Sequence, residues 1–348
     1  MRIAKHVRAL EPYTPGEQPK AKDVVKLNTN ENPYPPSPRC REVLAKFDLD
    51  RLRRYPDPEF AALRAALAEL NGTKPENIFI GNGSDEILAL SAKAFVEDDE
   101  LIGSLDPSYS LYKTLAAIRN VGWTGFAPSA LAPAALNRAK VALFLLTNPN
   151  APTGEFIDPP KVAALARNFR GILLVDEAYA DFARTNCMKL ATCRKNRNVL
   201  VMRTFSKSYS LAGLRVGYCV GPKDLIDALY KIKDSYNVDA VAQQIALAAV
   251  RDQPHFHRNV RKVVKGRDFL SAELKRRGWD VLPSESNFVF ARPANLPAAA
   301  LFDALRKRNI FVRHFKSPKT RDRLRITVGT DIQMKKLIRA IDELDIRK

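Results

Sequence analysis

Two unbroken apolar runs constrain the fold of this chain more than any other feature. Val141–Thr147 and residues 172–175 show no alternation of polar and apolar side chains, which is typical of strands buried on both faces of a parallel sheet. Between residues 57 and 251, runs of this kind alternate with helical patterns such as residues 58–70. The alternation predicts an α/β fold with a large, doubly wound and mostly parallel sheet.

The length of the chain predicts more than one domain. Its 348 residues exceed what a single hydrophobic core usually supports. We expect an N-terminal arm over residues 1–30, a large domain over 31–252 and a smaller α+β domain over 253–348. Because the arm is rich in proline, we expect it to lack regular structure and to pack on the small domain or on a partner subunit; the prolines are Pro12, Pro15 and Pro19.

Lys207 is a candidate nucleophile. It lies in the run RTFSKSYSLAGLRVGY at residues 203–218, where hydroxyl groups and the guanidinium of Arg215 are close to it in sequence. A lysine that forms a Schiff base must be held neutral in a partly dry, electropositive pocket. A lone Ser-Lys pair is far more often a solvated surface charge, so this assignment depends on other segments.

A strand-to-helix junction at residues 78–86 has the pattern of an anion site. Apolar residues run into glycines, and Ser84 and Asp85 then open an amphipathic helix. Backbone N–H groups at a helix start point toward an anion beside the positive helix end. A plain helix cap by Ser84 or Asp85 explains the junction equally well. Nucleotide binding is disfavoured, because a Walker lysine and the spacing of a dinucleotide fingerprint are lacking.

Polar residues also follow several predicted strands. Asp176 and Tyr179 come after residues 172–175, Asn150 lies in the proline-containing loop after Val141–Thr147, and Tyr109 follows another strand. Open α/β sheets bind ligands beyond the carboxyl ends of their strands, so these segments predict a ligand site at one sheet edge. A carboxylate there can hold a heterocyclic nitrogen protonated, whereas a solvated strand end is the alternative for Asp176 taken alone.

Four separated motifs, in this order, resemble those of the fold-type I pyridoxal-phosphate-dependent aminotransferases. The most specific is Ser-Lys followed by Ala-Gly-Leu-Arg-x-Gly, at residues 206–217. Three further segments are similar to the histidinol-phosphate branch of that family: LNTNENPY at 27–34, RYPD at 54–57 and LRITVGT at 324–330. The resemblance covers nearly the whole chain and implies pyridoxal 5′-phosphate as cofactor.

The resemblance also implies roles for individual residues. Lys207 would bond covalently to the cofactor and later carry the substrate proton, which requires a depressed pKa. Asp176 would pair with the pyridine nitrogen and Tyr179 with the ring hydroxyl oxygen, completing the catalytic set. Tyr109 would stack on the ring, and the phosphate would be held by Ser84, Asp85, Thr204, Ser206 and Arg215. The chain departs from the family at Ala151, where asparagine is common; either the neighbouring Asn150 or Tyr179 alone would replace that contact.

For substrates, the resemblance implies histidinol phosphate and 2-oxoglutarate, converted to imidazole-acetol phosphate and glutamate in histidine biosynthesis. Arginine recognises such anions bidentately. The implied substrate-binding residues are Tyr13, Asn28, Arg313, Arg325 and, across the interface of a homodimer, Tyr55. An aromatic or broad-specificity aminotransferase and a decarboxylase of phosphorylated amino acids share the cofactor motifs and remain alternatives.

The net charge of +19 requires its own explanation. Many of the cations lie in a long amphipathic helical pattern near residues 255–277, which belongs to a fold rather than to a disordered tail. A basic protein that binds nucleic acid is the alternative from a different class, but no dedicated module precedes the motif at residue 28 and we expect none. The charge can instead attract anionic substrates. Scattered Cys and His residues predict no metal site, and the absence of a long apolar run or signal pattern predicts a cytoplasmic enzyme without membrane contact.

Overall fold

A computed structural model describes residues 2–10, 16–20, 23–193 and 195–345. Its largest element is a seven-stranded sheet with the order β2-β8-β7-β6-β5-β3-β4. The strands are β2 (Ile78–Gly81), β3 (Leu101–Leu105), β4 (Gly122–Phe126), β5 (Val141–Thr147), β6 (Ile172–Asp176), β7 (Val199–Thr204) and β8 (Gly217–Val220). Only β8 runs against its neighbours β2 and β7, and the other pairs are parallel. The prediction of a doubly wound, mostly parallel sheet is confirmed.

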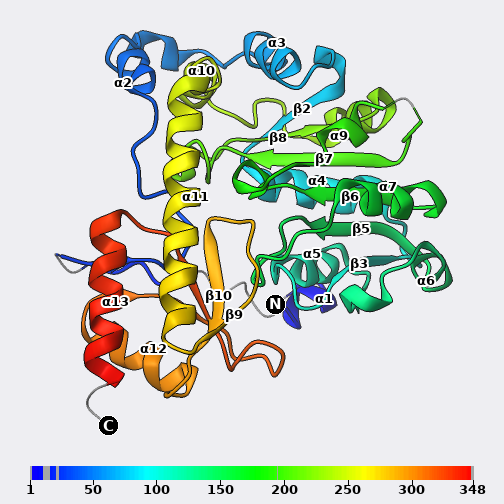
Figure 1. The fold of residues 1–348 in the computed structure, drawn as a ribbon. Coiled ribbons are helices and arrows are strands. Elements are labelled where there is room, and N and C mark those ends of the chain that lie inside the picture. The colour runs from blue at the N-terminus through cyan, green and yellow to red at the C-terminus, as the bar shows by residue number, and fades with distance from the viewer. Residues whose placement is uncertain (1, 11–15, 21–22, 194, 346–348) are drawn as a thin grey trace.

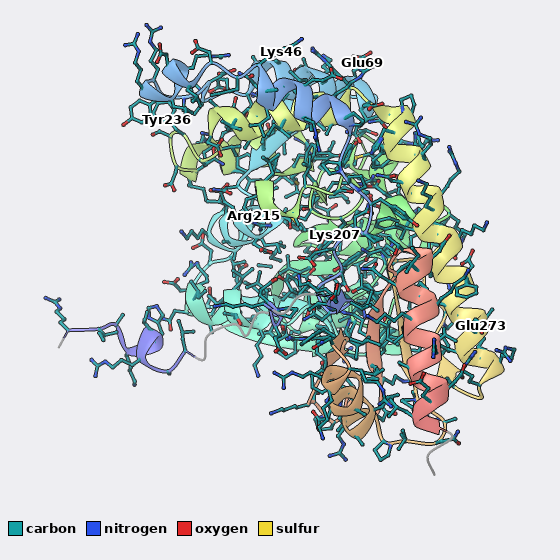
Figure 2. All side chains as sticks on the ribbon, turned by 90° about the vertical axis from the view of Figure 1, so that its left-hand side faces the viewer. Lys46, Glu69, Lys207, Arg215, Tyr236 and Glu273 are labelled. Atoms are coloured by element: carbon teal, nitrogen blue, oxygen red, sulfur yellow. The ribbon has the colours of Figure 1, made fainter. Side chains whose placement is uncertain are left out.

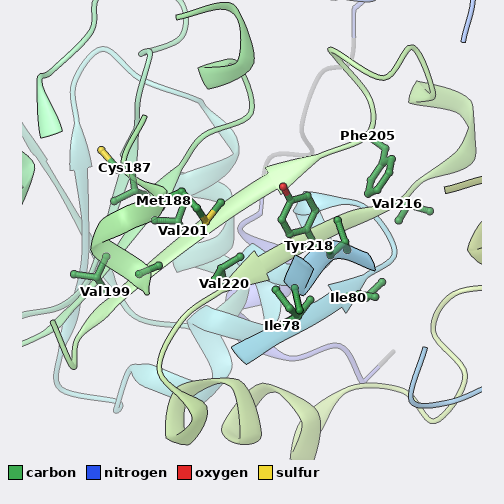
Figure 3. Packing of buried hydrophobic residues seen from close by; sticks show 14 of the residues in the cluster. Ile78, Ile80, Cys187, Met188, Val199, Val201, Phe205, Val216, Tyr218 and Val220 are labelled. Carbon is green, nitrogen blue, oxygen red and sulfur yellow. The ribbon is translucent and has the colours of Figure 1, made fainter. Parts of the chain in front are cut away.

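Helices cover both faces of this sheet (Figure 1). Along β5, Leu143 and Leu145 belong to one buried cluster, whereas Phe144 and Leu146 belong to another. Because side chains alternate between the faces of a strand, a sheet with two covered faces needs apolar residues at every position. Figure 3 shows one of these clusters, in which Val199 and Val201 of β7 pack with neighbouring strands. The unbroken apolar runs are explained by this double burial.

The helices around the large sheet follow the chain in order. They are α2 (Pro38–Ala45), α3 (Ala61–Leu70), α4 (Ser84–Phe95), α5 (Leu111–Arg119), α6 (Pro133–Arg138), α7 (Pro159–Asn168), α8 (Met188–Ala191), α9 (Lys223–Ile232) and α10 (Ala240–Val250). Short 3₁₀ turns lie at Leu49–Arg53, Pro75–Asn77, Pro128–Ala130, Ala180–Phe182 and Ala212–Leu214. None of the described helices is long and apolar enough to span a bilayer.

The long helix α11 (Gln253–Arg276) joins the two parts of the molecule (Figure 1). The Asp252 side chain caps its start by accepting a hydrogen bond from the backbone of His255. Phe256 near that start belongs to a core cluster of the large sheet, whereas Leu270 and Leu274 near the end belong to a separate apolar cluster. One helix thereby fixes the position of the second sheet relative to the first.

The second sheet is antiparallel and four-stranded, with the order β12-β13-β10-β9. Helices α12 and α13 complete its apolar cluster. The elements are β9 (Asp280–Val281), β10 (Phe288–Arg292), α12 (Ala298–Lys307), β12 (Arg313–His314), β13 (Leu324–Thr327) and α13 (Asp331–Asp345). This arrangement agrees with the expected smaller α+β part.

The N-terminal arm corrects one expectation. It contains the short helix α1 (Lys5–Arg8) and the strand β1 (Val25–Lys26), although we expected no regular structure there. β1 pairs in parallel with β11 (Ile310–Phe311), and Val25 and Leu27 join the apolar cluster of the small sheet. The expectation was wrong because both elements lie outside the proline-rich stretch. Residues other than proline keep a backbone N–H group, which can form the hydrogen bonds of a helix or a strand.

Candidate active site

A cavity of about 660 Å³ lies where the two sheets meet. Thr147, Asp176 and Thr204, each the last residue of its strand, line it from the large sheet. Arg313 of β12 and Arg325 of β13 line it from the small sheet. The cavity therefore occupies the position beyond the carboxyl ends of parallel strands at which α/β proteins bind ligands.

Lys207 projects into this cavity from the loop after β7. Its Nζ donates a hydrogen bond to the carbonyl oxygen of Thr29 at 3.3 Å and lies 5.8 Å from the ring centroid of Tyr179. Burial, assisted by the positive charges of Arg325 and Arg215, lowers the pKa of Lys207 to about 8. Figure 2 shows Lys207 and Arg215 near the middle of the molecule. About a tenth of the amine is consequently neutral, and therefore nucleophilic, at pH 7, which is far more than for an ordinary lysine.

Asp176 faces the same cavity from the end of β6, with a side chain that is buried. Its Oδ2 accepts a hydrogen bond from the Tyr112 hydroxyl at 2.8 Å, and its Oδ1 accepts one from the backbone N–H of Ala178 at 3.1 Å. Burial raises the pKa of this carboxyl to about 6, against the effect of these hydrogen bonds. A buried carboxylate of this kind gains from pairing with a positively charged ring nitrogen.

Tyr112 was missed by the sequence analysis. It is fully buried on α5 and its hydroxyl joins Asp176 to Thr147 of β5. The available signal was its position three residues after Tyr109, in the turn that leads into α5: the Tyr112 N–H donates to the Tyr109 carbonyl at 3.1 Å, and the two ring centroids are 5.6 Å apart.

Asn30, which orients Tyr179, is another residue that we did not single out from the sequence. The side-chain amide of Asn30 donates a hydrogen bond to the Tyr179 hydroxyl at 2.9 Å, and its oxygen accepts one from Thr327. Asn30 lies within the LNTNENPY motif, so the motif itself was the signal. Tyr179 is buried, and burial raises the pKa of its hydroxyl, which remains a neutral hydrogen-bonding group.

The proposed phosphate-binding residues gather at the start of α4. Two glycines permit Arg215 and the strand β8 to lie close to the start of α4. A Cβ at Gly83 would lie 2.6 Å from an Arg215 nitrogen, and one at Gly217 would lie 2.6 Å from the Ser84 backbone nitrogen. Arg215 lies 3.4 Å from both the Ser206 hydroxyl and the Asp85 carboxylate. The Thr204 hydroxyl donates to Ser206 at 3.0 Å.

This group of donors fits a phosphate. Backbone N–H groups at a helix start, two hydroxyls and a guanidinium all converge there. The Tyr109 hydroxyl also reaches the Asp85 carboxylate, at 3.5 Å. With Lys207 and Asp176 farther along the same cavity, the residues present match the phosphate, aldehyde and ring nitrogen of pyridoxal phosphate.

Asn150 requires a correction. We expected it as a substitute for the family asparagine at Ala151, but Ala151 lines the cavity and Asn150 does not. The Asn150 amide donates to the Pro107 carbonyl and to Thr153, both at 3.0 Å, while its oxygen accepts from Ser108 at 2.9 Å. These hydrogen bonds hold two loops together, and Tyr179, which lines the cavity, is the remaining candidate for the expected ring oxygen.

The expected substrate end is cationic and apolar. Arg325 donates to the Asn28 carbonyl at 3.0 Å, and its guanidinium lies 5.4 Å from the ring centroids of both Phe288 and Phe315. Arg313 lies 5.5 Å from the Phe315 ring. Such stacking holds a guanidinium plane in position while its edge remains available to an anion. Further side chains that line the cavity, which we did not anticipate, are Lys113, Trp123, Lys316, Ser317 and Thr320.

Of two further expected substrate residues, one is not described and the other lies away from the cavity of this chain. Tyr13 lies outside the described residues. Tyr55 is 79% exposed and stacks on Tyr236 with ring centroids 4.3 Å apart, on a surface away from the cavity lining. A role for Tyr55 therefore requires a second copy of the chain.

Comparisons with known proteins agree with this geometry. The model of the family described as aminotransferase class I and II matches residues 22–341. Histidinol-phosphate aminotransferase 1 of Bradyrhizobium diazoefficiens is 45% identical over 345 residues and 97% of each chain. The histidinol-phosphate aminotransferase of Citrifermentans bemidjiense is 42% identical over 98% of each.

One solved structure with a similar fold contains the expected cofactor. Histidinol-phosphate aminotransferase of Sinorhizobium meliloti, in complex with pyridoxal-5′-phosphate, superposes with a TM-score of 0.89 at 27% identity, over 98% of this chain and 97% of that one. The resemblance read from the motifs is confirmed: this chain belongs to the class I and II aminotransferases and, within them, groups with the histidinol-phosphate aminotransferases.

Proposed function

We propose that this chain transfers an amino group between L-histidinol phosphate and 2-oxoglutarate, giving imidazole-acetol phosphate and L-glutamate. The observation that carries the proposal is the position of Lys207. Its amine, with a pKa of about 8, lies in one cavity with a buried carboxylate and two arginines, Arg313 and Arg325. The names and high identity of the relatives support the choice of substrate.

Bound pyridoxal phosphate supplies a ring that stabilises negative charge at the α-carbon of the substrate. Ser84, Asp85, Ser206 and Arg215 would hold its phosphate, with Thr204 supporting Ser206, and Tyr109 would contact the ring face. Asp176 would keep the ring nitrogen protonated, because a buried carboxylate that accepts two hydrogen bonds is further stabilised by an adjacent positive charge. Tyr179, whose hydroxyl accepts a hydrogen bond from Asn30, would donate to the ring oxygen.

Lys207 then acts as the acid and base of the reaction. Its amine would carry a proton between the substrate carbon and the cofactor, which is efficient when the pKa is close to the working pH. Arg325 and Arg313 bind the anionic end of the substrate and so fix which carbon faces Lys207.

A panel of amino donors tests the proposed substrate. The holoenzyme is mixed with histidinol phosphate, unphosphorylated histidinol, phenylalanine, aspartate or phosphothreonine, and the change in cofactor absorbance is followed. Fast conversion by histidinol phosphate alone is expected, because the phosphate supplies the anion that the half-buried Arg313 and Arg325 would bind. A preference for phenylalanine would instead identify a broader aminotransferase. Carbon dioxide release from phosphothreonine would identify a decarboxylase, and strongly salt-dependent DNA binding without turnover would identify a nucleic-acid-binding protein.

The domain division and the assembly are also proposals. We take residues 1–30 as an arm, 31–252 as the cofactor domain and 253–348 as the small domain, with a homodimer as the active form. The exposed stacked pair Tyr55 and Tyr236 supports a contact with a second copy. If Tyr55 serves the partner's site, mixing Lys207→Ala with Tyr55→Ala chains creates mixed dimers with one intact site. The mixture should therefore be more active than the two variants measured separately, with a normal KM. Activity equal to that of the separate variants would count against the shared site.

A further inference from the structure

A buried cluster of charges lies directly behind the active site. Arg203 of β7 donates through Nε and Nη2 to one Glu177 oxygen, at 3.0 and 2.7 Å, and through Nη1 to Asp181. The second Glu177 oxygen accepts the backbone N–H of Cys187. The exposed side-chain fractions are 11% for Arg203, 0% for Glu177 and 12% for Asp181. None of these residues lines the cavity, so they do not contact the cofactor or the substrate directly.

Each member of the cluster is a sequence neighbour of an active-site residue. Glu177 follows Asp176 directly, and Asp181 lies two residues after Tyr179. Asp181 also accepts, at 2.5 Å, a hydrogen bond from the hydroxyl of Ser208, the residue after Lys207. The cluster thus joins the segment that carries Asp176 and Tyr179 to the loop that carries Lys207.

The energetics indicate a role beyond stability. Burial raises the pKa of Glu177, and the charge of Arg203 opposes that rise. Burial also disfavours the charged form of Arg203, but Asp181 and Glu177 overcome it and raise the pKa of the guanidinium above its ordinary value. A buried ion pair of this kind is commonly no more stabilising than apolar residues of equal volume. The ion pair instead fixes the relative orientation of the groups that it joins, since each hydrogen bond constrains an angle as well as a distance.

We propose that Arg203, Glu177, Asp181 and Ser208 form a clamp that positions the Lys207 amine relative to Asp176 and Tyr179. The backbone of the lysine loop is also held by Asn32, whose side-chain amide donates to the carbonyls of Lys207 and Ser208 at 3.1 and 3.2 Å. These are positioning residues: they act through Lys207, and the inference rests on the role proposed for that lysine. Small misplacements of a group that transfers protons lower the rate of the chemical step more than they weaken binding.

Ser208→Ala in the holoenzyme is the sharpest test, because it removes one hydrogen bond and no charge. Ser210→Ala is its matched control: Ser210 lies in the same loop, and its buried hydroxyl has no hydrogen-bond partner among the described residues. We expect Ser208→Ala to lower kcat about tenfold, with KM for histidinol phosphate and cofactor content changed less than about twofold. The pH midpoint of the cofactor's visible absorbance band should also move, whereas Ser210→Ala should match the unaltered enzyme in each measurement.

Asp181→Asn extends the test to the charges. It keeps the size of the side chain but weakens the contacts with Arg203 and Ser208, so the same pattern of a lower kcat and a shifted midpoint is expected, with a larger change. The clamp is overturned if Ser208→Ala behaves like Ser210→Ala, or if kcat falls only in step with lost cofactor and a lower Tm. Lys207→Ala separates the two proposals: an active Lys207→Ala enzyme refutes the role of the lysine, whereas an inactive one beside a normal Ser208→Ala enzyme refutes the clamp alone.

Discussion

The two ends of the cavity are built in different ways. At the cofactor end, Asp176, Thr204 and Ser84 stand at strand or helix termini of one sheet, next to glycines that permit close approach. At the substrate end, Arg325 bonds to Asn28, which lies on the N-terminal segment, 297 residues away. The first end is organised by local chain geometry, whereas the second exists only after the small sheet and the N-terminal segment have packed together. The comparison predicts that changes at the first end alter the chemical step and changes at the second end alter substrate choice.

The largest effect is expected at Lys207. Lys207→Ala should lower the rate of amino transfer by about 10⁴-fold or more, because both the nucleophile and the proton carrier are lost. The visible absorbance band of the lysine-bound cofactor should disappear. Single-turnover absorbance measurements check both results, with Lys93→Ala as a control at an exposed lysine of α4. Retained transamination in the Lys207 variant would break the assignment of the cofactor end.

Asp176→Asn comes next. An amide cannot hold a ring nitrogen protonated, so kcat should fall by about 10²–10³-fold, as for other groups that stabilise developing charge. Binding of an anionic substrate should change much less, since Asp176 lies at the opposite end from Arg325. Steady-state kinetics separate kcat from KM. A selective rise in KM would mean that the two ends are not independent.

Arg325→Met tests the substrate end. Loss of a guanidinium that pairs with a buried anion commonly costs about 2–5 kcal/mol, so kcat/KM for histidinol phosphate should fall at least about 30-fold. Unphosphorylated histidinol, used as the comparison substrate, should be affected far less. An equal loss with both substrates would show that Arg325 acts on the chemistry through Lys207, whose pKa its charge helps to lower.

The pH dependence of cofactor capture follows from the lowered pKa of Lys207. Only the neutral amine attacks an aldehyde, so the capture rate of cofactor-free protein should rise about tenfold per pH unit below the pKa. It should level off near pH 8, the value to which burial lowers this pKa. Stopped-flow absorbance measures the profile. A rise that continues toward pH 10 would mean that Lys207 behaves as an ordinary exposed lysine.

The smallest effect is expected at Tyr112. Tyr112→Phe removes the hydroxyl that donates to Asp176 at 2.8 Å. A hydrogen bond to a charged group contributes about 1.5–3 kcal/mol, and part of this remains through the Ala178 donor, so kcat should fall roughly tenfold. Tyr230→Phe, at a tyrosine outside the cavity lining, is the control. An unchanged kcat would show that the Ala178 donor alone holds Asp176.

Much of the cofactor end could be read from the sequence. Unbroken apolar runs reflect burial on both faces, and polar residues directly after them must lie at the carboxyl edge of the sheet. Asp176 and Ser84 were singled out in this way, and Lys207 from the hydroxyls and the guanidinium close to it in sequence, because each belongs to a short segment in which neighbours along the chain are also neighbours in space. Hydrophobic periodicity and helix-start geometry are local properties.

Contacts between distant segments could not be predicted from these local properties. The pairing of β1 with β11, the reversed direction of β8, and the turn of Asn150 away from the cavity all follow from packing between segments far apart in the chain. A side-chain amide or hydroxyl bonds to whichever partner the completed fold brings within about 3 Å, and nothing in its own neighbourhood specifies that partner. The residue types that carry the chemistry of this site can thus be recognised in short motifs. The orientation of their side chains and the assembly of the substrate end depend on packing between distant segments.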